Sequence, residues 1–135
     1  MNELKLDEAR VDRLDEVLAF VDGILEGLDC PMKVQLQLDV AVEELYVNIG
    51  HYAYAPGVGP AVIRVEAEDG PTVAITFIDQ GMPYDPTAKP DPDVTLSAEE
   101  RQIGGLGIYM VKKSVDDMAY RREGDSNVLT IRKRL

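Results

Sequence analysis

Asp79 ends an alternating apolar pattern and is the first candidate for ligand recognition. Three apolar residues occupy alternate positions before it: Val73, Ile75 and Phe77. Asp79 continues their face of the strand, so its carboxylate points with the core side chains. A charged group in that position needs a partner, and an adenine amino group would serve, because a carboxylate accepts its N–H and the purine ring packs against apolar walls. The alternative interpretation is an ordinary aspartate–glycine turn after a strand.

A glycine-rich segment leads directly into a predicted helix; its residues are Gly104, Gly105, Leu106, Gly107 and Ile108. Residues without a Cβ let main-chain N–H groups approach phosphate oxygens, and a helix N-terminus adds partial positive charge. The segment lacks the Gly-Lys-Ser/Thr of a P-loop and follows a loop instead of a first βα strand. Neither the Walker nor the Rossmann pattern therefore fits. The alternative interpretation is a flexible hinge for a lid.

A third pair of candidate residues lies on a predicted helix. Glu44 and Asn48 are four residues apart, so they lie about 40° apart around the helix axis and share one face. Glu43 points elsewhere, at roughly 140° from Asn48. One face therefore presents a carboxylate and a carboxamide, one turn apart. The alternative interpretation is that both are solvated polar residues on an amphipathic helix.

Helices and a small sheet must bring these three segments together. Apolar spacing of three and four predicts helices over residues 11–28, 31–54 and about 106–115. Period-two patterns predict strands over about 3–6, 61–68, 73–79, 118–122 and 127–134. Because the helices group together and most strands form hairpins, we expect an α+β fold with helices on one face of an antiparallel or mixed sheet. We expect a single domain over residues 1–135, with one core.

The segment between Gly81 and Gly105 has no sustained period and carries four prolines: Pro83, Pro86, Pro90 and Pro92. It is too long for an ordinary connection in a domain of this size. Segments of this kind are usually lids or disordered, and we expect a lid over about residues 82–104.

Composition limits the classes of partner. Twenty-five acidic and fourteen basic residues give a net charge of −11, a field that repels nucleic acid and anionic membranes. The same charge opposes a nucleotide, so an ATP site needs local positive potential from a metal ion, N–H groups or basic side chains. The single Cys30 suits a reducing compartment, and we expect neither a signal peptide nor a membrane span, because residues 1–10 lack basic and apolar signal regions and no stretch is long and apolar enough. We therefore expect a cytoplasmic protein that binds neither nucleic acid nor membrane directly.

Taken in chain order, the three segments resemble the motifs of the GHKL ATPase/kinase superfamily. The N box corresponds to VEELYVNIGHYAY at residues 42–54, the first glycine box to DQGMP at 79–83, and the second glycine box to GGLGIYMV at 104–111. The resemblance spans about residues 14–135. The short length is most similar to the bacterial anti-sigma-factor serine/threonine kinases. It implies a two-layer α/β sandwich of the Bergerat, histidine-kinase-like ATPase type.

The resemblance also implies roles for individual residues. Asn48 would coordinate Mg²⁺ through its side-chain oxygen, Asp79 would read the adenine amino group, and Gly81 would let the backbone pass close to the base. Glu44 would be the general base in transfer of the γ-phosphoryl group. The glycine-rich segment supplies the other cofactor-binding residues, Gly104, Gly105, Leu106, Gly107 and Ile108, of which 105–107 would hold phosphates.

Two further cofactor-binding candidates depart from the motif. Pro83 stands where many members of the superfamily have glycine, and it would stiffen the start of the lid. The basic residue that faces the phosphates is not fixed by the motif; Arg101 is the candidate, and a solvated charge is the alternative. The lone His51 lies near the face of Asn48 and either approaches the pocket mouth or is hydrogen-bonded scaffolding.

The function that the resemblance implies is that of an ATP-dependent serine/threonine protein kinase with ATP and Mg²⁺ as cofactors. It would phosphorylate a small anti-sigma-factor antagonist protein, otherwise sequester a sigma factor, and act as a homodimer. Two alternatives stay open at the level of sequence. One is an ATP-binding regulatory module without productive phosphoryl transfer, and the other is an interaction domain that has lost its nucleotide.

Overall fold

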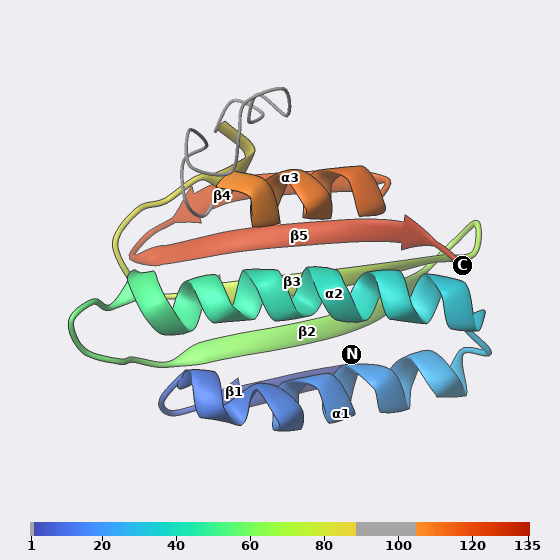
Figure 1. Cartoon of the computed structure of the whole chain (residues 1–135), viewed down its shortest axis with the longest axis horizontal. Helices are drawn as coiled ribbons and strands as arrows, with labels where there is room; N and C mark the ends of the chain where they lie inside the picture. Colours follow the sequence, from blue (N-terminus) through green and yellow to red (C-terminus); the bar gives the residue numbers. More distant parts are fainter. Residues whose placement is uncertain (1, 89–104) are drawn as a thin grey trace.

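Five antiparallel strands form one sheet in the order β1-β2-β3-β5-β4 (Figure 1). The computed structural model describes residues 2–88 and 105–135. The strands are β1 (Asn2–Leu6), β2 (Ala61–Glu68), β3 (Thr72–Asp79), β4 (Asp117–Glu123) and β5 (Ser126–Arg134). Burial alternates along β2 and β3 because successive side chains point to opposite faces, and only one face is covered.

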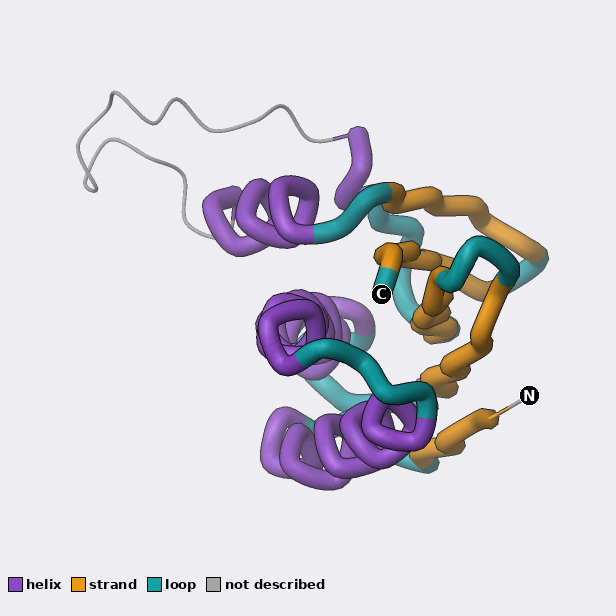
Figure 2. Tube along the Cα trace, turned by 90° about the vertical axis from the view of Figure 1, so that its right-hand side faces the viewer, coloured by secondary structure: helices purple, strands orange, loops and turns teal. Residues whose placement is uncertain are grey.

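Among the described residues, the α-helices α1, α2 and α3 form a second layer against one face of this sheet (Figure 2). They are α1 (Leu14–Gly27), α2 (Met32–Asn48) and α3 (Gly105–Ser114), and α2 lies between the other two (Figure 1). A π-helical turn, Ile49–Ala53, continues α2. Short 3₁₀ turns precede α1 and occupy Pro86–Ala88. Within the described residues, no helix combines the length and the apolar character needed to cross a membrane.

The core lies between the helices and the inner face of the sheet. Its largest fully buried side chains include Tyr46 of α2, Phe77 of β3 and Leu6 of β1. The hydroxyl of Tyr46 donates a 2.6 Å hydrogen bond to the carbonyl oxygen of Arg10, so this buried polar group keeps a partner. Burial raises the pKa of Tyr46 to about 12. The core therefore fixes α2, which carries two of the candidate residues, against the sheet.

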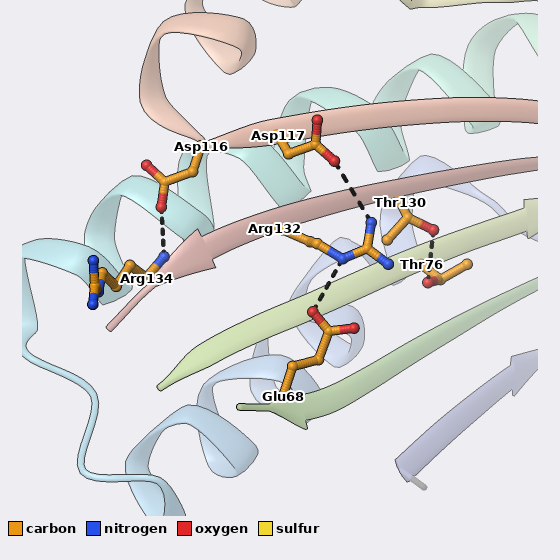
Figure 3. Close-up of polar contacts among 7 residues, drawn as sticks. All are labelled: Glu68, Thr76, Asp116, Asp117, Thr130, Arg132 and Arg134. Atoms are coloured by element: carbon orange, nitrogen blue, oxygen red, sulfur yellow. Dashed lines mark hydrogen bonds and ion pairs between the residues drawn. The ribbon is translucent and has the colours of Figure 1, made fainter. Parts of the chain in front are cut away.

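The register between β3 and β5 decides which polar residues meet. Asp79 lies directly opposite Asn127, and Thr76 lies opposite Thr130. Asp79 and Asn127 are both buried on the helix-covered side. Thr76 and Thr130 point to the other face, where their hydroxyl groups lie 3.0 Å apart (Figure 3).

Ion pairs join several strands on the outer face of the sheet. Arg132 of β5 contacts Glu68 of β2 at 3.0 Å and Asp117 of β4 at 3.6 Å (Figure 3). On the same face, Arg64 contacts Glu3 at 2.6 Å. These partly exposed pairs contribute little individually, but they join strands that are far apart in the sequence.

The expected α+β, two-layer architecture is confirmed. Of the two sheet types that the sequence allowed, mixed or antiparallel, the sheet is antiparallel. The predicted second helix was too long as a single α-helix. Its α-helical part ends at Asn48, and the next five residues form the π-helical turn. Periodicity alone does not reveal this change, because residue types at 49–53 do not interrupt the helical pattern.

Candidate functional site

A cavity of about 350 Å³ lies between the C-terminal half of α2 and the inner face of the sheet. Its walls come from α2, the π-helical turn, β3, the segment after β3, β4 and β5. Lining residues are Leu45, Asn48, Ile49, Tyr52, Ala53, Phe77, Asp79, Met82, Tyr84, Pro86, Tyr120, Asn127 and Leu129. The walls are mainly apolar, with a few polar groups, as in sites that bind small molecules.

Asp79 is the buried carboxylate of this cavity, with 7% of its surface exposed. Its Oδ1 accepts two hydrogen bonds, from the N–H of Gly81 at 2.8 Å and from Nδ2 of Asn127 at 2.9 Å. Oδ2 has no hydrogen-bond partner among residues 2–88 and 105–135, and this oxygen is not completely buried. The carboxylate therefore keeps one oxygen for the N–H of a ligand.

Asn127 is the residue that holds Asp79, and it is itself 6% exposed. Its Nδ2 also donates to the carbonyl oxygen of Met82 at 2.9 Å. Its Oδ1 accepts from the hydroxyl of Tyr120 at 2.6 Å and from Nη1 of Arg122 at 3.2 Å. These partners fix the orientation of the amide, because a flipped amide would place its oxygen against Asp79 and the carbonyl of Met82.

The backbone after β3 is pressed against the π-helical turn. A Cβ on Gly81 would overlap the carbonyl oxygen of Ala53, so only glycine fits at this close approach. The next N–H, of Met82, donates to that same carbonyl at 3.0 Å. The N–H of Gln80 donates to the hydroxyl of Tyr54 at 2.6 Å. The segment that leaves the sheet is therefore fixed where it forms the cavity wall.

Asn48 and Glu44 connect the cavity to α3. Asn48 lines the cavity, and Glu44 is half-buried one turn earlier on α2. A Cβ on Gly107 would overlap Oε2 of Glu44, so the carboxylate lies directly against the first turn of α3. The positive end of the helix dipole stabilises a carboxylate in that position. Glu43 is exposed, as its predicted direction requires.

The structure brings some of the predicted residues together and leaves others apart. Asn48 and Asp79 line the cavity. Gly81 does not line it, but its N–H donates a hydrogen bond to Asp79. Gly105, Leu106 and Gly107 begin α3, whose buried Ile108 belongs to the core at 2% exposure. Pro83 and His51 are exposed and do not line the cavity. Arg101 and Gly104 lie outside the described residues, as does most of the predicted lid.

Sequence reasoning missed Asn127 and Tyr120. A signal for Asn127 was present, because it shares an alternating face with Leu129 and Ile131 and therefore points toward the core. That is the argument that identified Asp79. Tyr120 gives no such signal, since a half-buried tyrosine in a strand is common.

The cavity fits an adenine nucleotide in its chemistry. An apolar enclosure matches the faces of a purine, and Oδ2 of Asp79 matches its amino group. Among the described residues, no group of three or more His, Cys, Asp or Glu side chains could hold a metal ion. The side-chain oxygen of Asn48 suits Mg²⁺, which takes few protein ligands and fills the rest with phosphate and water oxygens.

Residues 8–133 match the model of the histidine kinase-like ATPase domain. Over 99 residues, the chain is 26% identical to the serine/threonine-protein kinase BtrW of Bordetella bronchiseptica, covering 73% of this chain and 70% of that protein. The resemblance to this superfamily that the three motifs indicated is confirmed.

Two solved structures share the fold at low sequence identity. A chain of the SiaB–SiaC complex from Pseudomonas aeruginosa superposes with a TM-score of 0.59 at 12% identity, covering 96% of this chain and 88% of that one. The histidine kinase domain of the blue-light-activated kinase EL346 from Erythrobacter litoralis gives a TM-score of 0.53 at 15% identity, covering 89% and 60%. At these identities the likeness shows the fold alone.

Proposed function

The chain belongs to the histidine kinase-like ATPase domain family, and we propose that it is an ATP-dependent serine/threonine protein kinase of the anti-sigma-factor class. The observation that carries this proposal is that Asn48 and Asp79, from separate sequence motifs, line one cavity of nucleotide-compatible chemistry. A relative that is named as a serine/threonine kinase supports the reaction class. The family itself implies ATP binding.

Adenine recognition is assigned to Asp79. Oδ2 accepts a hydrogen bond from the 6-amino group, while Oδ1 stays engaged by Gly81 and Asn127. The purine ring packs between apolar walls that include Phe77 and Leu129. A carboxylate that is already oriented loses little freedom when the ligand binds, which favours affinity.

Phosphate and metal binding are assigned to the end of α2 and the start of α3. The side-chain oxygen of Asn48 binds Mg²⁺, which neutralises charge on the transferred phosphoryl group. Main-chain N–H groups of Gly105, Leu106 and Gly107 hold the phosphates at the helix N-terminus. Arg101 and the lid over about residues 82–104 complete this part of the proposal. Local positive potential at α3 offsets the net charge of −11.

Glu44 is the general base of the proposed reaction. It accepts the proton of the attacking serine or threonine hydroxyl as the oxygen bonds to the γ-phosphorus and the bond to ADP breaks. Its carboxylate lies against Gly107 and one turn from Asn48, so it is close to both proposed phosphate and metal ligands. The acceptor of the phosphoryl group is a small anti-sigma-factor antagonist. When it does not act on the antagonist, the protein sequesters a sigma factor, and it does so as a cytoplasmic homodimer.

A transfer assay with γ-labelled ATP and purified candidate antagonists tests the proposal. Glu44→Ala is expected to lower the transfer rate by about 10²- to 10⁴-fold and to spare ATP binding. Glu43→Ala is the matched control, because this exposed neighbour points away from the site, and it should transfer at the wild-type rate. Asn48→Ala and Asp79→Ala should each weaken Mg·ATP binding in calorimetric titrations.

Two outcomes would contradict the proposal in different ways. ATP binding that depends on Asp79, with no transfer to any antagonist supplied, would favour a regulatory module that binds ATP without phosphoryl transfer. Failure of Mg·ATP to bind or to raise the melting temperature of the wild type would favour an interaction domain without a nucleotide.

A further inference from the structure

Asn127 stands out among the cavity residues because it uses every hydrogen-bonding group of its side chain on the walls of the site. Its amide joins β5 to Asp79 of β3 and to Met82 in the segment that follows. The carbonyl oxygen of the same amide accepts from Tyr120 of β4 and, at 3.4 Å, from the N–H of Tyr84. One side chain therefore ties three cavity-lining elements together.

The direction of the bond between Asn127 and Asp79 determines what Asp79 can bind. Nδ2 is a donor, so it occupies Oδ1 of the carboxylate and leaves Oδ2 as an acceptor. Without this donor, only the N–H of Gly81 would restrain Oδ1, and the carboxylate could rotate about its terminal torsion, which is soft. An acceptor held toward the cavity favours a ligand that offers an N–H at this edge over a ligand that offers a carbonyl.

We infer that Asn127 is a positioning residue that sets the purine specificity of the site through the orientation of Asp79. The inference rests on the proposed function, since it concerns how the same cavity distinguishes purines. Adenine presents an amino group at position 6, and guanine presents a carbonyl oxygen that would face the carboxylate. The oriented Oδ2 therefore selects the 6-amino group and rejects the 6-oxo group.

The test pairs a protein change with a ligand change. Wild type is titrated calorimetrically with Mg·ATP and with Mg·purine riboside triphosphate, which lacks only the 6-amino group. We expect ATP to bind about 10- to 100-fold more tightly, the usual effect of one hydrogen bond to a buried charge. In Asn127→Ala the ratio of the two affinities is expected to fall below about threefold.

Thr130→Val is the matched control. Thr130 lies three residues along the same strand, and its hydroxyl bonds Thr76 on the opposite face of the sheet (Figure 3). The substitution also removes one inter-strand hydrogen bond but should leave the affinity ratio at its wild-type value. The same titrations with GTP should show its rejection relaxed in Asn127→Ala and unchanged in Thr130→Val.

A second variant keeps the test decisive if Asn127→Ala does not fold. Tyr120→Phe preserves the ring and removes only the hydroxyl that donates to Oδ1 of Asn127. It is expected to lower the affinity ratio by about two- to threefold.

A ratio that stays at the wild-type value in both variants would overturn the inference, even if both nucleotides bound more weakly, because a merely structural role weakens them equally. Wild type that binds ATP and purine riboside triphosphate equally would also overturn it. Wild type that binds neither would contradict the proposed function itself.

Discussion

Aspartate side chains are partly or fully buried at the cavity and between α1 and α2, and the groups that contact the carboxylate differ between these two sites. At the cavity, Oδ1 of Asp79 receives two hydrogen bonds, from Gly81 and Asn127. Between α1 and α2, Asp22 and Asp39 lie against each other. Their Oδ1 atoms are buried and, within the described residues, have no donor.

The contrast shows that burial alone does not decide what a carboxylate does. At Asp79 the neighbours are N–H donors, which engage the carboxylate oxygen directly. Where a second carboxyl is the neighbour, the charged form is disfavoured, and a shared proton lets one carboxyl donate to the other. Burial is the largest cause and the neighbouring Asp22 the second; together they raise the pKa of Asp39 to about 7. Burial also raises the pKa of the thiol of Cys30, which lies in the connection between α1 and α2. The nearby Asp39 and Asp22 contribute to this increase as smaller causes.

The largest expected effect is on the cavity side of this comparison. Asp79→Ala leaves the N–H of Gly81 and the amide of Asn127 without their acceptor. We expect the free energy of unfolding to fall by about 3 kcal/mol, the cost of two buried donors left unpaired. Urea denaturation at pH 7 measures it. The matched change Asp39→Ala removes the same atoms but should not destabilise the fold; equal losses in the two variants would contradict the contrast.

Gly81→Ala tests whether the same cluster is rigid. The added Cβ overlaps backbone atoms of Ala53, which cannot move without shifting the π-helical turn. We expect a loss of about 2 kcal/mol in the free energy of unfolding. Gly23→Ala is the control, because a Cβ at this helical position meets no atom within 4 Å. It should instead stabilise the protein by about 0.5–1 kcal/mol, the difference in helix propensity. Equal melting temperatures for the two alanine variants would contradict this prediction, because they would mean that the backbone around Ala53 moves to accommodate the added Cβ.

Asp39→Asn should change stability in the other direction. At pH 8 the substitution removes one of two facing charges and supplies an amide donor to Asp22. We expect the free energy of unfolding to rise by about 1 kcal/mol, allowing for solvent screening of this half-buried pair. Urea denaturation at pH 8 is the measurement. A destabilised variant would mean that the charged pair has a stabilising partner.

The pH dependence of that difference gives the smallest signal. Between the ordinary value of 3.8 and the folded value of about 7, folded Asp39 holds a proton that the unfolded chain releases. Its contribution to stability is therefore fully present below pH 4 and is lost as pH rises toward 7. The advantage of Asp39→Asn over wild type should accordingly be near zero at pH 4.5 and grow to about 1 kcal/mol at pH 8. Denaturation of both proteins across this range checks the sign, and a constant difference would contradict it.

Sequence reasoning predicted the elements and the direction of Asp79 because both follow from local periodicity. An alternating strand fixes which side chains face the core, and the three, four spacing of α1 fixes its buried stripe. The grouping of Asn48 with Asp79 came from the superfamily resemblance, and in the structure both residues line the same cavity. Local pattern thus predicted most of the fold and, within the cavity, the direction of Asp79.

The remainder depended on pairing between distant segments. The opposition of Asp79 and Asn127 is a matter of register between β3 and β5, which single-strand patterns do not determine. The same register pairs Thr130 with Thr76 on the opposite face of the sheet. The contact of Asp22 with Asp39 likewise depends on how α1 and α2 pack. Neither aspartate is distinguishable in the sequence from a solvated helix residue.

The π-helical turn Ile49–Ala53 has a consequence for chain length. Such a turn accommodates one residue more than an α-helical turn does. Removing a single residue there would let α2 run on regularly and would swing Ala53 by about 100° around the axis. Its carbonyl oxygen would then leave the N–H of Met82, to which it is bonded at 3.0 Å. The closure of the cavity therefore depends on the number of residues between Asn48 and Tyr54, as well as on their identity.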